Sequence, residues 1–190
     1  MTRTMHRSGS LAWVSAPPSA LRVIVSEEPM TAREAMTRYP WAWALLDGAM
    51  FRLCGGGRDY ATTPCAALDY LALDPKTGAA SLGVYPARGA TIAYRQNGAL
   101  DVLRGDGMPL PAGTLVAWQG YPTLIERGEV IASDAANTDR TERAAVAVSF
   151  HPKPVLHLVS GVGTMAAFAR ELAAALAPEL AVYTDGGLFR

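Results

Sequence analysis

Short β-prone runs recur about every ten residues in the middle of the chain, and this spacing limits the fold more than any other feature. The runs cover Thr91–Tyr94, Leu100–Arg104 and Thr114–Gln119, with glycine and asparagine between them. Such spacing is typical of antiparallel strands, because a parallel pair needs a long crossover connection. Two further runs, Ala144–Phe150 and Val155–Val159, flank a turn that contains two prolines. The central sheet is therefore expected to be mostly antiparallel or mixed.

Two helices are indicated by capping residues and apolar periodicity. Thr31 begins a capping box, and its helix should end before Pro40. From Thr164 to Ala177 apolar side chains recur at helical spacing, and Pro178 follows. Further strands are expected in four apolar runs: Leu21–Val25, Trp41–Leu46, Leu68–Leu73 and Leu180–Tyr183. The sequence predicts an α+β fold, with a mostly antiparallel or mixed central sheet and two to three packed helices.

The chain has the size and composition of one globular domain. Of its 190 residues, 50% are apolar, which suffices for a real core. Residues 1–20 are interpreted as a loose N-terminal segment and residues 21–190 as the domain. Trp41, Trp43 and Trp118 are assigned to the core.

Charge and hydropathy exclude several classes of function. The net charge is zero and no basic run occurs, so the sequence lacks the clustered positive charge of a nucleic-acid-binding protein. No apolar run is long enough for a membrane span, and the first residues do not resemble a secretory signal, so a cytoplasmic protein is expected. Two cysteines do not make a disulfide scaffold or a zinc motif. No cofactor is expected.

Three segments, taken in order, resemble the phosphodiester glycosidase family. Leu46–Phe51 is similar to a strand end that reads Asn-Gly-Gly-Phe-Phe in the family. Gln119–Ile125 resembles the family's Gly-x-Pro-x-Leu stretch. Arg143–Val148, further along the chain, resembles the Arg-Thr-Ala strand that follows it in the family. The helix from Thr164 and the strand before Asp185-Gly186-Gly187 resemble a closing unit that ends in Asn-Leu-Asp-Gly-Gly. The resemblance covers the chain from about residue 21 to its end.

The resemblance implies hydrolysis of the bond between a sugar's anomeric carbon and a phosphate. It implies that Arg143 binds the phosphate and that Asp185 is the main catalytic carboxylate, as base or nucleophile. Asp47 is the second carboxylate or a ligand of a sugar hydroxyl. The remaining candidates bind substrate, through close backbone approach at three glycines and through one aromatic ring: Gly48, Gly186, Gly187 and Tyr60. The expected partner is a sugar phosphodiester or a nucleotide sugar.

Several departures from the family's motifs keep other functions open. Asp47 replaces an asparagine, Ala49 a glycine, Ala144 a threonine and Tyr183 an asparagine, and the serine that follows Asp-Gly-Gly in the family is missing. The alternatives are a catalytically inactive relative that binds a phosphorylated sugar or nucleotide, and an accessory or structural protein of a phage or surface-polymer locus. Asp47 and Asp185, with a backbone oxygen, could also hold a divalent metal loosely.

Each candidate also has a purely structural interpretation. Asp-Gly is an ordinary turn sequence, which applies to both aspartates. Arg143 could pair with Glu142 or another surface acid, and Arg140-Thr141 is a competing register for the family's arginine motif. His151 and His157 are interpreted as surface or core histidines and not as ligands.

Overall fold

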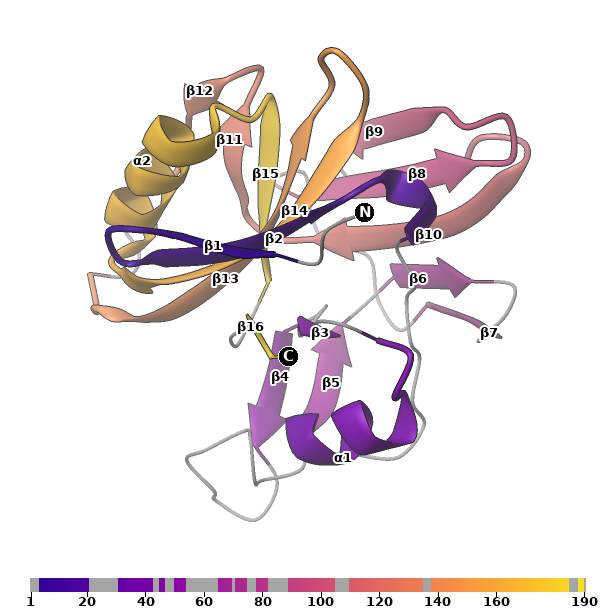
Figure 1. Ribbon diagram of the computed structural model, residues 1–190, viewed down its shortest axis with the longest axis horizontal. Helices are drawn as coiled ribbons and strands as arrows, with labels where there is room; N and C mark the ends of the chain where they lie inside the picture. Colours follow the sequence, from indigo (N-terminus) through magenta and orange to yellow (C-terminus); the bar gives the residue numbers. More distant parts are fainter. Residues whose placement is uncertain are drawn as a thin grey trace.

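The computed structural model has the α+β fold that the sequence predicts (Figure 1). It describes residues 4–20, 31–42, 45–46, 50–53, 65–69, 71–74, 78–81, 89–104, 110–134, 138–184 and 188–189. All paired strands among these residues are antiparallel. The strands form a seven-stranded sheet, a five-stranded sheet and two two-stranded pairs.

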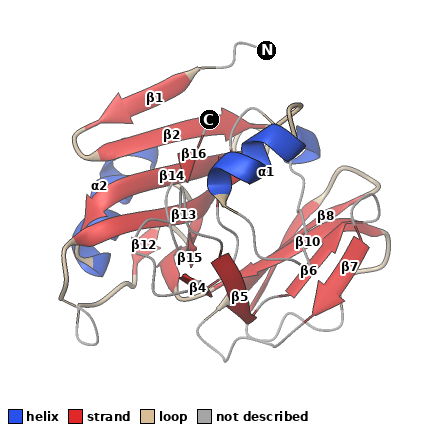
Figure 2. Ribbon diagram, turned by 90° about the horizontal axis from the view of Figure 1, so that it is seen from below, coloured by secondary structure: helices blue, strands red, loops and turns tan. Residues whose placement is uncertain are grey.

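The seven-stranded sheet has the order β1-β2-β14-β13-β15-β11-β12. Its strands are β1 (Met5–Ser8), β2 (Leu11–Ala16), β14 (Val155–Gly163), β13 (Thr141–Ser149), β15 (Leu180–Thr184), β11 (Thr123–Glu126) and β12 (Glu129–Val130). The predicted strands at 144–150, 155–159 and 180–183 are confirmed. β13 and β14 form the expected hairpin around the turn with two prolines. Figure 2 shows β1, β2, β14 and β13 side by side.

The N-terminal residues belong to this sheet, so the expectation of a loose segment is wrong for residues 5–16. β1 pairs with β2, and β2 pairs with β14 from Ala12 to Ala16. The side chains of Leu11 and Val14 are buried in the core. The pairing partner lies about 145 residues further along the chain, and a local sequence pattern carries no signal of so distant a strand.

The five-stranded sheet has the order β7-β6-β10-β8-β9. Its strands are β7 (Gly78–Ser81), β6 (Leu71–Asp74), β10 (Thr114–Gly120), β8 (Ala90–Arg95) and β9 (Leu100–Arg104). The three regularly spaced strands are confirmed, and β6 pairs with β7 up to Asp74 and Gly78. The single strand predicted at 68–73 is instead divided between β5 (Cys65–Asp69) and β6, which belong to different sheets.

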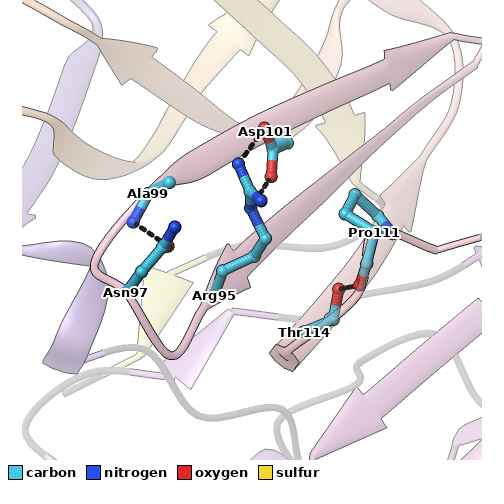
Figure 3. A network of polar contacts seen from close by, with 6 residues as sticks. All are labelled: Arg95, Asn97, Ala99, Asp101, Pro111 and Thr114. Carbon is cyan, nitrogen blue, oxygen red and sulfur yellow. Dashed lines mark hydrogen bonds and ion pairs between the residues drawn. The ribbon is translucent and has the colours of Figure 1, made fainter.

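The β8–β9 hairpin carries a small polar network near its turn (Figure 3). Arg95 forms an ion pair with Asp101 across the two strands, with 2.5 Å between Nε and Oδ2. In the turn, Ala99 N–H donates to Asn97 Oδ1 at 3.0 Å. The ion pair is partly exposed, so we expect it to contribute little to stability.

Both predicted helices are confirmed. α1 (Ala32–Arg38) begins with the capping box of Thr31 and Glu34, in which each side chain accepts from the other residue's backbone N–H. α2 (Met165–Leu176) is capped by Thr164 and ends at Ala177, which has φ = 43°. A short 3₁₀ helix, η1, covers Pro18–Ala20.

The strand predicted at 41–46 is confirmed only at its end, where β3 covers Leu45–Leu46. Trp41 is 54% exposed and was assigned wrongly to the core; it packs edge-on against Tyr39. Trp118 is buried as predicted, whereas Trp43 and the strand predicted at 21–25 lie outside the described residues. β3 pairs with β16 (Leu188–Phe189), and β4 (Met50–Leu53) pairs with β5.

The core lies on both faces of the seven-stranded sheet. On one face α2 packs Phe168 and Leu172 against apolar side chains of the sheet. On the other face Ile92 and Trp118 of the five-stranded sheet pack against Val146 and its neighbours. No helix among the described residues is long and apolar enough to cross a membrane.

Candidate functional site

The segments that carry the family resemblance are far apart in the sequence but adjacent in the structure. β15 lies between β13 and β11, and it pairs with both. Tyr183 N–H donates to Pro122 O at 2.9 Å, and Tyr121 N–H donates to Tyr183 O at 3.1 Å. These bonds join the end of β15 to the chain that follows β10. The second and third motif segments therefore meet at the end of β15.

Gly120 allows β10 and β15 to approach closely at this point. A Cβ atom on Gly120 would lie 2.9 Å from Tyr183 O and 2.5 Å from the Trp118 ring. Real Cβ atoms do not come this close to backbone atoms, so any larger residue would push the two strands apart.

The first motif segment is joined to the last by a second pairing. Leu46 of β3 pairs with Leu188 of β16, and Leu45 pairs with Phe189. In Figure 1 β16 lies next to β3 and below β15. The chain on either side of both candidate aspartates is thus anchored by described strands.

Arg143 is the one candidate site residue that the structure describes, and it is 3% exposed. Its guanidinium donates to three oxygens: Nε to Gly163 O at 3.3 Å, Nη1 to the Tyr183 hydroxyl at 3.4 Å and Nη2 to Asp139 O at 2.9 Å. The guanidinium also lies 5.8 Å from the centre of the Tyr183 ring, within range of a cation–π contact. These contacts hold the group at the end of the sheet.

The alternative of a surface ion pair between Arg143 and Glu142 is wrong. Neighbouring side chains of a strand point to opposite faces, and Glu142 is exposed whereas Arg143 is buried. Arg140 is also exposed. Of the two arginines considered for the family motif, only Arg143 is buried, as expected for a side chain that is held in a fixed position.

A negative charge lies near Arg143 at the start of α2. Asp134 accepts from the Thr164 hydroxyl at 2.9 Å and from Ala166 N–H at 2.8 Å. The bond from Ala166 lowers the pKa of the Asp134 carboxyl, and the charges of Arg170 and Arg143 contribute less. No local sequence pattern identifies Asp134 as a cap of α2, because the residues that it contacts lie about 30 positions later in the chain.

The other site candidates lie outside the described residues: Asp47, Gly48, Tyr60, Asp185, Gly186 and Gly187. Their described neighbours are Leu46 of β3, Thr184 at the end of β15 and Leu188 of β16. Thr184 is 2% exposed, and among the described residues its hydroxyl has no hydrogen-bond partner. The sequence signal for Thr184 was a single polar side chain in an otherwise apolar strand.

The two histidines have the structural roles that the sequence analysis favoured. His157 is buried between two hydroxyls, with Ser15 Oγ 2.8 Å from Nδ1 and Ser149 Oγ 3.2 Å from Nε2. Burial lowers the pKa of His157, and the nearby His6 adds to this effect. His151 is exposed in the β13–β14 turn. Within the described ranges, no group of three His, Cys, Asp or Glu side chains could hold a metal ion.

Comparison with protein-family models and with curated proteins finds no match. Two solved structures show a distant likeness in fold. One is the catalytic domain of zebrafish N-acetylglucosamine-1-phosphodiester alpha-N-acetylglucosaminidase, auto-inhibited by its pro-peptide, with 18% identity, a TM-score of 0.42 and coverage of 63% of this chain and 50% of that chain. The other is a hypothetical protein from Synechocystis, with 15% identity, a TM-score of 0.44 and coverage of 98% of this chain and 57% of that chain. This chain thus spans about half of either protein, and both TM-scores are too low for a functional inference.

Proposed function

We propose that this chain is a hydrolase that cleaves the bond between a sugar's anomeric carbon and the phosphate of a glycosyl phosphodiester. One observation carries the proposal: β15 pairs with β11 and β13, and β16 pairs with β3. Segments separated by up to about 140 residues, each resembling part of one family's motifs, are thereby neighbours in space. If each Asp-Gly were only an ordinary turn, the motif segments would not need to be neighbours in space.

The register between β13 and β15 supports a pair of Arg143 and Asp185. The last pair in this ladder is Ala144 with Thr184. The residue before Ala144 is Arg143, and the residue after Thr184 is Asp185. Opposite residues of an antiparallel pair share one face, so we expect the Asp185 carboxylate beside the Arg143 guanidinium.

The pairing of β3 with β16 supports Asp47 as the second carboxylate. Leu46 pairs with Leu188, and Asp47 follows Leu46 directly. Asp185 is three residues before Leu188 in the sequence, and three residues span at most about 11 Å. We therefore expect both aspartates at the same end of the molecule as Arg143.

The proposed chemistry uses one cation and two carboxylates. The transition state resembles an oxocarbenium ion, as in glycoside hydrolysis, and a phosphate monoester is a good leaving group. Arg143 would bind oxygens of the departing phosphate, for which a planar guanidinium is suited. Asp185 would act as base or nucleophile at the anomeric carbon, and Asp47 as the second carboxylate or a sugar ligand. Gly48, Gly186 and Gly187 would allow backbone N–H groups near the anion, and Tyr60 would line the pocket.

The test is release of free sugar from a panel of sugar 1-phosphodiesters and nucleotide sugars. We expect Asp185→Asn to reduce kcat by several orders of magnitude, because the catalytic carboxylate is lost. Asp101→Asn is the matched control, since Asp101 belongs to the surface ion pair of the β8–β9 hairpin. Undiminished turnover by Asp185→Asn, in a preparation whose wild type is active, would remove Asp185 from the catalytic role.

A second candidate is a non-catalytic module that binds a phosphorylated sugar or nucleotide. The specific observation in its favour is that protein oxygens already accept from at least three of the five N–H donors of Arg143. Measurable binding of panel compounds without release of sugar from any of them would favour this module over the hydrolase.

A further inference from the structure

Thr184 has a buried hydroxyl for which the described residues provide no hydrogen-bond partner. Thr184 is 2% exposed, and within the described part of the chain Oγ1 has no hydrogen-bond partner. A buried hydroxyl without a partner is unfavourable, and such groups are rare in native proteins. Thr184 is also the last described residue before Asp185, so its hydroxyl lies at the point where the proposed site begins.

The cross-strand neighbours of Thr184 form a row of small side chains. Thr184 is opposite Ala144 on β13, and Ala144 is opposite Ser160 on β14. Directly opposite residues share a face, so the two hydroxyls lie on the same side of the sheet with a methyl group between them. The Cα atoms of Thr184 and Ser160 are about 10 Å apart by ordinary strand spacing. Thr184 and Ala144 are buried, whereas Ser160 at the other end of the row is half-buried.

The surroundings of this row suit a neutral ligand group better than an anion. The residues that precede Thr184 on its face of β15 are Val182 and Leu180, and Ala144 and Ser160 are uncharged. Arg143 points to the opposite face, because it is adjacent to Ala144 on β13. A buried anion needs a paired charge, whereas a hydroxyl of a sugar needs only hydrogen bonds.

We propose that Thr184 Oγ1 hydrogen-bonds a hydroxyl of the sugar, with Ser160 at the open end of the same subsite. The inference rests on the proposed function, in which Arg143 binds the phosphate at the same end of the sheet. The motif that this segment resembles has leucine where this chain has Thr184, so the hydroxyl is a departure from that motif.

The test compares Thr184→Val with Thr91→Val. Valine has the shape of threonine and lacks the hydroxyl. Thr91 is the matched control, since its hydroxyl is also buried and unpartnered among the described residues but lies on β8 of the other sheet. Each variant is assayed for KM with the most active compound of the panel. Inhibition constants are measured for the released free sugar and for inorganic phosphate, and melting temperature is measured without ligand.

We expect Thr184→Val to raise KM and the inhibition constant of the free sugar about tenfold, the size of one lost hydrogen bond. The inhibition constant of inorganic phosphate should not change, and Thr184→Ser should restore most of the affinity. Both valine variants should melt at or above the wild-type temperature, because each removes an unsatisfied buried hydroxyl, and Thr91→Val should leave all binding constants unchanged.

If the wild type is active and Thr184→Val changes neither KM nor the inhibition constant of the free sugar, this inference is overturned. The proposed function is not affected by that result. A raised inhibition constant for phosphate alone also overturns it. If the wild type releases no sugar, thermal stabilisation by glucose, galactose, mannose and N-acetylglucosamine replaces the kinetic readout. Stabilisation that Thr184→Val abolishes supports the subsite without catalysis, and no stabilisation of the wild type by any of the four overturns both proposals.

Discussion

At the scale of single residues, the properties of a buried polar side chain depend on the groups that contact it. Arg143 and His157 are both buried in the seven-stranded sheet, yet their environments differ. Arg143 donates to backbone and tyrosine oxygens that keep its charge satisfied. Among the described residues, two hydroxyls contact the ring nitrogens of His157, and both are compatible with an uncharged ring. Its burial therefore makes protonation unfavourable.

The lowered pKa of His157 predicts a dependence of stability on pH. The unfolded chain binds a proton to this residue near pH 6.5, whereas the folded chain does so only at lower pH. Between these two values the unfolded state holds more protons, so the free energy of unfolding should fall as pH falls below about 6.5. Urea denaturation at several pH values measures this effect. We expect His157→Gln to flatten the pH profile between pH 5 and 7, and His151→Gln, an exposed control, to keep the wild-type profile.

At the scale of elements, α2 is held on the sheet by close contact with a glycine of β14. A Cβ atom on Gly161 would lie 2.7 Å from Leu11 Cδ2 and 3.2 Å from the Phe168 ring. Gly161 also pairs with Arg143 across the β13–β14 ladder. The contact therefore links the position of α2 to the backbone that carries the candidate phosphate ligand.

We predict that Gly161→Ala destabilises the protein by about 1–3 kcal/mol, the usual cost of an extra methyl group in a packed core. Gly163→Ala is the control: its Cβ would meet Phe168 N at 3.4 Å, an ordinary contact. Chemical denaturation of the two variants measures the difference. Equal stability of Gly161→Ala and the wild type would mean that α2 is not seated as closely as the structure has it.

At the scale of the whole molecule, the N-terminal hairpin closes one side of the main sheet. β2 pairs with β14, and Leu11 belongs to the core cluster under α2. The hairpin turn also contacts α2 directly, since Ser10 donates through its backbone N–H and its hydroxyl to the Glu171 carboxylate, each at 2.6 Å. The first residues of the chain thus belong to the same cooperative unit as its last helix.

Deletion of residues 1–16 should abolish cooperative thermal unfolding, because it exposes the edge of β14 and removes Leu11 and Val14 from the core. Deletion of residues 1–4 should leave the melting temperature nearly unchanged, since β1 begins at Met5. Thermal unfolding followed by circular dichroism distinguishes the two truncations. A sharp transition in the chain that lacks residues 1–16 would restore the interpretation of this segment as loose.

Local sequence patterns determined the elements whose signals are local. The α1 capping box uses residues three positions apart, and the apolar period of α2 repeats within one helix. Turn residues lie in the sequence between the evenly spaced strands β8, β9 and β10. These elements, and the α+β class that they imply, followed from the sequence because the interactions that define them are close in the chain.

Tertiary structure alone decided the features whose partners are distant in the chain. Trp41 lies in an apolar run yet is exposed, and β2 has a weak local pattern yet lies in the main sheet. The sequence singled out Arg143 by a motif, but only the fold shows that its guanidinium is buried and bound to Tyr183. Likewise, only the folded sheets bury the hydroxyl of Thr184 where no described residue hydrogen-bonds it. Burial and pairing between distant strands depend on the whole chain, and a local pattern does not encode them.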